Sequence, residues 1–237
     1  MRGTDMHDRD ALMRFIEGNE RLSSLLGIVE ARMDDDPGHD LDHCLRVALW
    51  TLRLGAGEFD DQRAVAAALL HDIVNVPKNS PERSRASEKC AQVAREVLEP
   101  LGFGSSAVQE ICDAIRDHSY SRGSVPTSSL GRCLQDADRL EAVGAIGVMR
   151  TISTGVRMNA AYFHGTDPWA RERPLDDAAY SVDHFYAKLL RLAPSMLTER
   201  GREEAIRRSR FMEAFLAQLG DELAQPPPPS RYPDSGS

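Results

Sequence analysis

The chain has 237 residues, of which 41% are hydrophobic, 28% charged and 6% aromatic, as in a globular protein of one large domain or two small ones. Its 29 Lys and Arg residues and 37 Asp and Glu residues give a net charge of −8, which argues against binding nucleic-acid polymers, because phosphate backbones require a basic face. The sequence shows neither a signal-peptide core nor an apolar run of membrane-spanning length. We therefore expect a cytoplasmic protein without membrane contact.

Apolar residues recur at three- and four-residue steps along most of the chain, which predicts an all-α fold, a single helical bundle. Proline, glycine and capping residues divide this pattern into separate helices. Helices are expected over residues 10–33, 41–54, 61–73 and 87–98, after a cap at Ser105 or Ser106, over 130–150 with a bend at Gly144, and over 180–192 and 198–223.

Two segments depart from the helical pattern. Residues 155–177 have no period and contain Pro168 and Pro174, which predicts a long irregular loop. Its aromatic residues could stack on a base or sugar, or could fasten the loop to the body of the protein: Tyr162, Phe163, His164 and Trp169. The last residues contain four consecutive prolines and little apolar surface, so we expect a domain over 1–224 and a disordered tail over 225–237.

The four cysteines are far apart and form no CxxC pair. This spacing favours buried free thiols in a reducing compartment over a disulfide framework or a zinc-binding thiolate cluster.

The strongest chemical signal is a His-Asp dipeptide, His71-Asp72, directly after the apolar run AVAAALL. An ionised carboxylate in an apolar setting is costly unless a cation or another partner compensates it, and a divalent metal does so directly. Taken alone, such a dipeptide is more often a helix end that meets solvent than a metal site. However, His39 and His43 lie on one helix face upstream, and Asp136 and Asp138 lie in an otherwise apolar helix downstream.

Together these residues resemble the H…HD…D signature of the HD-domain metal-dependent phosphohydrolases. The segments GHDLDHCLRV, AALLHDIVNVPKNSPER, DHSYS and QDADRLEAVGAIGVMRT, followed by DPWARERPLDD and VDHFYAKLL, resemble in order the small bacterial subgroup of YedJ-like and YpgQ-like proteins. The resemblance covers roughly residues 12 to 224 and implies an all-α bundle around one metal site.

The resemblance implies that His43, His71, Asp72 and Asp138 hold one divalent transition metal, which could be Mn, Fe, Ni, Co or Zn. In the motif the ligating Asp precedes Arg-Leu, which selects Asp138 over Asp136. Binuclear members need two further histidines between the HD dipeptide and the distal Asp, whereas this chain has only His118 there. We therefore expect a mononuclear site.

Further residues are candidates for phosphate binding and proton transfer. Asp72 is expected to orient or deprotonate the attacking water, and His118 to bind phosphate or transfer a proton. Lys78 and Arg83 follow the HD dipeptide and are suited to a phosphate clamp, although each could instead be a solvated loop residue. Arg139 is a further candidate for substrate binding, or could pair with nearby acids.

The resemblance implies an enzyme, a metal-dependent hydrolase of phosphate esters or anhydrides, with a small phosphorylated substrate of the nucleotide class. Two alternatives remain open: a catalytically silent HD-type module that binds a regulatory ligand, and an HD-type oxygenase, which the missing histidine disfavours. The released product, the general acid and the oligomeric state also remain open, with a homodimer as one alternative.

Overall fold

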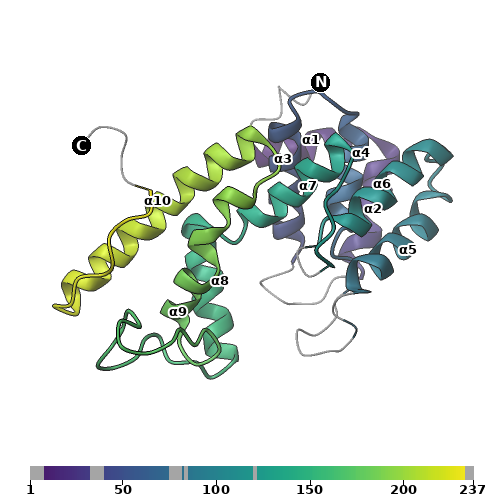
Figure 1. The fold of residues 1–237 in the computed structure, drawn as a ribbon. Coiled ribbons are helices and arrows are strands. Elements are labelled where there is room, and N and C mark those ends of the chain that lie inside the picture. The colour runs from purple at the N-terminus through teal and green to yellow at the C-terminus, as the bar shows by residue number, and fades with distance from the viewer. Residues whose placement is uncertain (1–7, 33–39, 75–81, 83–84, 120–121, 233–237) are drawn as a thin grey trace. The chain divides into compact units, whose positions relative to one another are not determined.

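The structure is a computed structural model that describes residues 8–32, 40–74, 82, 85–119 and 122–232. The chain divides into two compact units, residues 1–138 and 139–237 (Figure 1). The described residues are mainly helical, as predicted, with one isolated β-bridge between Ala161 and Tyr180. No described helix is both long and apolar enough to cross a membrane.

The first unit is built from helices whose starts are mostly set by Asp and Asn caps. The single helix expected over 10–33 is wrong, because Gly18 closes one helix and the Asn19 side chain accepts a bond from the Leu22 amide, starting another. The helices are α1 (Arg9–Glu17), α2 (Glu20–Glu30), α3 (Leu41–Gly55), α4 (Asp61–Leu70), α5 (Ala86–Leu98), α6 (Ser105–Asp117) and α7 (Ser129–Leu140), which continues past the unit boundary.

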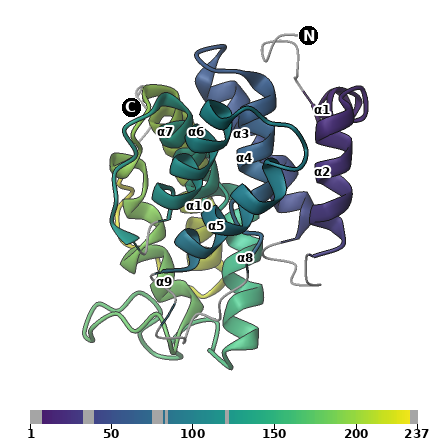
Figure 2. The ribbon, with the colours of Figure 1, turned by 90° about the vertical axis from the view of Figure 1, so that its right-hand side faces the viewer.

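Helix α4 lies at the centre of this unit and contacts α2, α3 and α6, while α5 packs along α6 (Figure 2). Every residue from Ala64 to Leu70 is fully buried, which explains why the sequence of this helix shows no polar face. The expected extent to Ile73 is too long, because α4 ends at Leu70 and His71 occupies its C-cap. The helix therefore delivers the His-Asp dipeptide into the interior.

The second unit contains the bend that the sequence predicted near Gly144, which begins α8 with a φ of 79°. The single helix expected over 180–192 is wrong, since its regular α-helical part stops at Ala187 and two 3₁₀ turns follow. The elements are α8 (Gly144–Arg157), α9 (Ser181–Ala187), η4 (Leu189–Arg191), η5 (Ala193–Ser195) and α10 (Glu199–Glu222), with α8 and η5 packed on α10.

The irregular loop between α8 and α9 is closed at its base by the Ala161–Tyr180 bridge. Arg173 donates to both carboxylate oxygens of the buried Asp183, and its guanidinium lies over the Tyr180 ring. Trp169 is only 4% exposed and packs edge-to-face on Tyr186. The burial of Trp169 against Tyr186 favours a role in anchoring the loop to the second unit over a role in stacking on a substrate base.

The four cysteines are buried and free, as the spacing predicted. The expected disorder of the tail disagrees with the structure over 225–232, where side chains and backbone groups hydrogen-bond to Trp169, Glu213 and Leu190. Residues 233–237 lie outside the described residues. The predicted domain boundary at residue 224 stays a prediction.

Candidate metal centre

Four side chains from three helices converge in the first unit. The Nε2 atoms of His43 and His71 are 3.2 Å apart. An oxygen of Asp138 lies 3.6 Å and 3.8 Å from these two nitrogens, and an oxygen of Asp72 lies 3.9 Å and 3.6 Å from them. Ligand atoms held about 2.1 Å from one ion are themselves roughly 3.0–3.5 Å apart. The two imidazole nitrogens have this spacing, and each carboxylate oxygen lies a few tenths of an ångström farther from them, with Asp138 and Asp72 in two separate groups of potential ligands that share His71.

The local sequence explains why these side chains meet. The Asp40 carboxylate caps α3 by accepting a bond from the His43 amide at 2.8 Å, which fixes His43 in the first turn. His71 and Asp72 follow the end of the buried helix α4, and Asp138 lies near the end of α7. Both imidazoles are fully buried, whereas the side chains of Asp72 and Asp138 are 27% and 29% exposed. A substrate would therefore approach from the carboxylate side.

The hydrogen bonds of His71 and His118 point their free nitrogens toward the cluster. The Nδ1 atom of His71 lies 2.7 Å from the Ala68 carbonyl oxygen, and that of His118 lies 2.6 Å from the Ile115 carbonyl oxygen. A carbonyl only accepts, so each Nδ1 is the protonated donor, and in the neutral ring Nε2 carries a lone pair. Such an arrangement of imidazole lone pairs and carboxylates fits a divalent cation.

The pKa values of His71 and Asp138 also indicate that the cluster favours a bound cation. Burial alone would lower the pKa of His71, but the charge of Asp72 and a hydrogen bond with Asp138 raise it well above the ordinary value. Burial alone would raise the pKa of Asp138, yet its bond to His71 and the charge of that ring hold it well below the ordinary value. The carboxylates thus demand a positive partner, which in the metal-free protein is a proton on His71.

His118 lies close to this centre without sharing all its partners. Its ligand nitrogen lies within 4.8 Å of the ligand atoms of His71 and Asp72, and its ring meets that of His71 edge-to-face at 5.1 Å. Burial, followed by the charge of His71, lowers the pKa of His118, so the ring is neutral at neutral pH. A neutral imidazole is suited to accepting a proton or a hydrogen bond rather than to acting as a fixed cation.

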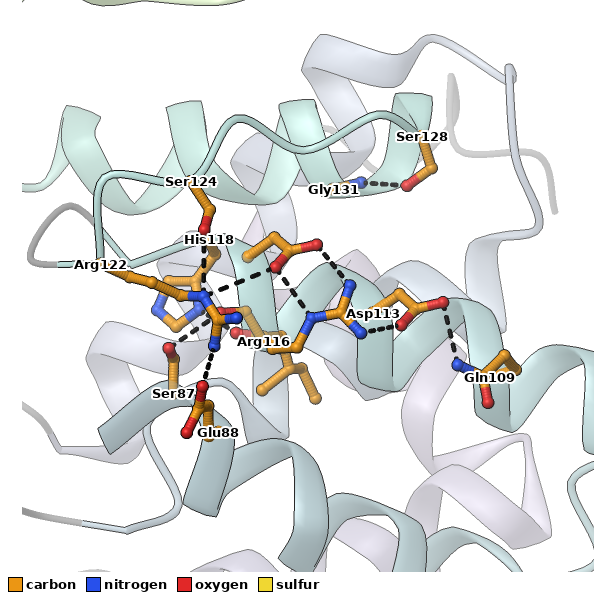
Figure 3. A network of polar contacts seen from close by, with 12 residues as sticks. Ser87, Glu88, Gln109, Asp113, Arg116, His118, Arg122, Ser124, Ser128 and Gly131 are labelled. Atoms are coloured by element: carbon orange, nitrogen blue, oxygen red, sulfur yellow. Dashed lines mark hydrogen bonds and ion pairs between the residues drawn. The ribbon is translucent and has the colours of Figure 1, made fainter. Parts of the chain in front are cut away.

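A polar network holds the end of α6 that carries His118 (Figure 3). Ser87 Oγ donates to the Arg116 carbonyl at 2.8 Å, and Gln135 Nε2 donates to the Asp117 carbonyl at 3.1 Å. These bonds satisfy carbonyls that a helix end leaves without intrahelical partners. Neither residue was predicted from the sequence, because the neighbours of Gln135 on its face of α7 are themselves polar, among them Arg132, Asp138 and Arg139.

Charged pairs surround this helix end. Arg116 binds Asp113 and Asp117, and Arg122 donates to Glu88 at 2.7 Å (Figure 3). The Arg116 partner holds the pKa of Asp117 below its ordinary value, although burial opposes this. These pairs hold Arg122 against Glu88 of α5 and Asp117 of α6.

The structure also separates the two acids of the DAD sequence. Asp138 belongs to a group of described residues able to hold a metal, together with His43 and His71, whereas Asp136 belongs to no such group among them. Asp136 is fully buried and is engaged by other groups of the chain. The role of Asp138 as a ligand stays a prediction.

The remaining predicted site residues have different positions. Arg139 is half-buried and its Nη1 donates to the Ser195 carbonyl at 2.7 Å, which is a structural contact. Burial raises the pKa of the Cys44 thiol, so this neighbour of His71 remains a neutral thiol rather than a thiolate ligand. His39, Lys78 and Arg83 lie outside the described residues, and their predicted roles stay predictions.

Comparison with known proteins agrees with this geometry. The HD domain family model matches residues 40–143, which include all four predicted ligands. YpgQ of Bacillus subtilis, an uncharacterised protein, is 33% identical over 196 residues, covering 80% of this chain and 87% of YpgQ.

Solved structures show the same relationship. The crystal structure of Bacillus subtilis YpgQ in complex with ADP matches with a TM-score of 0.67 and 27% identity, covering 86% of this chain and 95% of YpgQ. An HD-superfamily hydrolase from Bacillus thuringiensis matches with a TM-score of 0.66 and 29% identity, covering 86% and 97% of the two chains. The chain belongs to the HD-domain superfamily of hydrolases, in the YpgQ-like subgroup.

Proposed function

We propose that this protein is a metal-dependent phosphohydrolase that cleaves phosphate esters or anhydrides of nucleotides. The observation that carries the proposal is the pair of buried imidazole nitrogens 3.2 Å apart, with an oxygen of each of two partly exposed carboxylates within 3.6–3.9 Å of both nitrogens. This donor set suits a divalent transition metal, and the exposed carboxylate side leaves room for a phosphoryl group to approach.

A nucleotide is the favoured substrate because a related protein of the same fold has been crystallised with ADP. That relative shares 27% of its residues with this chain over nearly its whole length. The net charge of −8 makes a small phosphorylated molecule a more fitting partner than a nucleic-acid polymer.

The roles of the residues follow from their positions. His43, His71, Asp72 and Asp138 hold the metal, which when bound would supply Lewis-acid activation of a water and of a phosphoryl oxygen. Asp72 orients the attacking water and accepts its proton, because its carboxylate lies within 4.8 Å of the ligand nitrogens of both His71 and His118. His118, neutral and fixed by Ile115, accepts a hydrogen bond or proton at Nε2.

Cations that bind the phosphate complete the proposal. Lys78 and Arg83, which follow the ligands in sequence, are proposed to neutralise charge that develops on the transferred phosphoryl group. Arg139 is a weaker candidate, since its Nη1 donates to the Ser195 carbonyl and substrate binding would compete with that contact.

The decisive experiment combines metal analysis with a nucleotide hydrolysis screen. We expect about one transition metal per chain, and hydrolysis that stops on chelation and returns when a single metal is added back. Chromatography of the products would distinguish release of phosphate from release of pyrophosphate. A fully metal-loaded protein that binds ADP but hydrolyses no nucleotide in the panel would contradict the proposal and favour a regulatory ligand-binding module.

The raised pKa of His71 predicts how metal affinity depends on pH. A metal can bind His71 only after the proton leaves, so affinity should rise with pH until the pH passes the raised pKa. Below that point it should fall about tenfold per pH unit for each displaced proton. Chelator competition between pH 5.5 and 9 measures this; a constant affinity down to pH 6 would show that His71 is not a ligand.

The same group predicts opposite pH trends for the stability of the two forms. In the metal-free protein the pKa of His71 lies above its unfolded value of about 6.5, so its stabilising effect is complete below that pH and is lost as the pH rises through the folded pKa. Stabilisation by added metal should increase over the same range. Melting temperatures measured with and without metal at pH 6 and pH 9 test these opposite trends.

A further inference from the structure

The C-terminal segment turns back at the end of α10 and runs along that helix (Figure 1). Ala224 adopts a left-handed conformation with a φ of 52°, and the Gln225 amide donates to the Gly220 carbonyl at 2.9 Å. This turn reverses the chain, so the prolines that follow lie against the second unit rather than extending into solvent.

Two side chains of the loop between α8 and α9 bind the start of the segment. Trp169 Nε1 donates to the Gln225 carbonyl at 2.8 Å, and Arg171 Nη2 donates to the Pro226 carbonyl at 2.6 Å. Both partners are backbone carbonyls, which proline retains although it lacks an amide hydrogen. The contacts are therefore suited to a proline-rich chain.

The far end of the segment is held by a second set of contacts. The Glu213 carboxylate accepts bonds from the Ser230 hydroxyl and from the Arg231 amide, the latter at 2.6 Å. The Tyr232 hydroxyl donates to the Leu190 carbonyl at 2.8 Å, so the phenol is directed toward η4. Three different groups thus bind three positions of the segment: the Glu213 carboxylate at Arg231, the Trp169 indole at Gln225 and the Leu190 carbonyl at Tyr232.

The prolines lie between these two ends and cover an aromatic surface. Pro227, Pro228 and Pro229 line a cavity of about 240 Å³ together with Trp169, Tyr186 and Leu216. Consecutive prolines favour an extended helix that pays little ordering entropy, and grooves that recognise such segments are characteristically lined with aromatic residues. We call the surface formed by Trp169, Tyr186, Leu190, Glu213 and Leu216 the proline groove.

Gly220 provides independent support that the groove is shaped for this segment. A Cβ atom at this position would lie 2.5 Å from Cδ of Pro227 and 3.1 Å from the Gln225 carbonyl oxygen. Gly220 lies inside α10, where glycine is the less favourable choice for helix stability. The glycine therefore weakens the helix and in return allows the segment to approach.

We propose that the proline groove is a binding site for a proline-rich peptide of the type Pro-Pro-Pro-Ser-Arg-Tyr, and that residues 225–232 of the same chain are its resident occupant. The site lies entirely within the second unit and does not depend on the proposed hydrolase activity.

The first experiment separates the groove from its occupant. Truncation after Ala224 in a Trp50→Phe background leaves Trp169 as the only tryptophan. A synthetic peptide of residues 225–232 should then bind saturably and change Trp169 fluorescence, whereas the full-length chain, whose groove is filled, should show no binding. Absence of binding to a folded truncated protein would overturn the proposal.

Matched variants test the specificity of the site. In the truncated protein Glu213→Ala should lower the affinity for the peptide by about tenfold or more, because charge-assisted hydrogen bonds are lost. Glu222→Ala, at an exposed acid of the same helix that bonds to Gln218, should leave the affinity unchanged. Equal affinities in both variants would contradict the assignment of Glu213.

Gly220→Ala should have opposite effects in the two backgrounds. In the truncated protein alanine removes the glycine penalty in α10 and should raise the melting temperature. In the full-length protein the new Cβ meets Pro227, so the substitution should lower the melting temperature and accelerate exchange of the Arg231 amide. The same change in both backgrounds would show that the segment does not occupy the groove.

Two readouts keep the proposal testable if truncation prevents folding. In the full-length chain the Arg231 amide should exchange more slowly than a random coil, and Glu213→Ala should remove this protection while Glu222→Ala retains it. Random-coil exchange in the parent protein would overturn the proposal. A dimer that dissociates upon truncation would overturn the assignment to the same chain and place the segment in the groove of a second copy.

Discussion

His71→Ala should leave the protein without its metal and without metal-dependent hydrolysis. His71 is fully buried, and its Nε2 lies within 3.8 Å of His43, Asp72 and Asp138. Loss of a ligand should lower the metal affinity by more than the roughly 10- to 100-fold lost when a hydrogen bond that supports a ligand is removed. Turnover should fall on the order of 1,000-fold or more, and metal analysis of the purified variant measures the cause directly.

The control is a histidine in the other unit. His184 Nδ1 pairs with the Asp177 carboxylate at 2.9 Å and has no proposed role at the centre, so His184→Ala should retain one metal per chain and the parent rate. A melting curve of each variant separates loss of the ligand from loss of the fold. A folded His71→Ala protein with a full metal complement would refute the assignment of the centre.

The sequence predicted most helices because their apolar faces repeat with the helical period. It failed where a single residue interrupts a continuous pattern, as at Asn19, whose side chain caps a new helix although the apolar spacing continues on both sides. It failed again after Ala187, where the apolar residues remain but the regular hydrogen-bond pattern gives way to 3₁₀ turns. Periodicity reports which face is buried, not whether the backbone is continuous.

The four predicted ligands came from the resemblance, and spacing alone could not have shown that they meet. Their convergence depends on how α3, α4 and α7 pack, which is a tertiary property. Ser87 and Gln135 escaped notice for the same reason: they act on backbone carbonyls next to His118, and a carbonyl has no sequence signature.

The tail shows the limit of arguments from composition. Four prolines and few apolar residues predict disorder when the segment is considered alone, because it cannot form a core of its own. The segment instead uses a surface built by other elements, through Trp169, Glu213 and Gly220. A composition rule averages over a segment and does not register a surface made elsewhere in the chain.

Asp138→Asn and Asp136→Asn should have different effects although the residues are two positions apart. Asp138 lies 3.6 Å from His43 and is partly exposed, so removing its charge should abolish metal-dependent hydrolysis and weaken metal binding by about 100-fold or more. Asp136 is fully buried and engaged elsewhere, so its variant should keep the metal and lose about 1–3 kcal/mol of unfolding free energy.

The two variants make a matched pair because each replaces a carboxylate by an amide of the same shape on the same helix. Metal content, turnover at saturating nucleotide and denaturant unfolding of the metal-free proteins separate ligation from packing. Without the Asp138 charge the pKa of His71 should also fall toward its ordinary value, since one of the groups that raises it is gone. If Asp136→Asn instead loses the metal while Asp138→Asn retains it, the ligand is Asp136 and the geometry at the end of α7 has been misassigned.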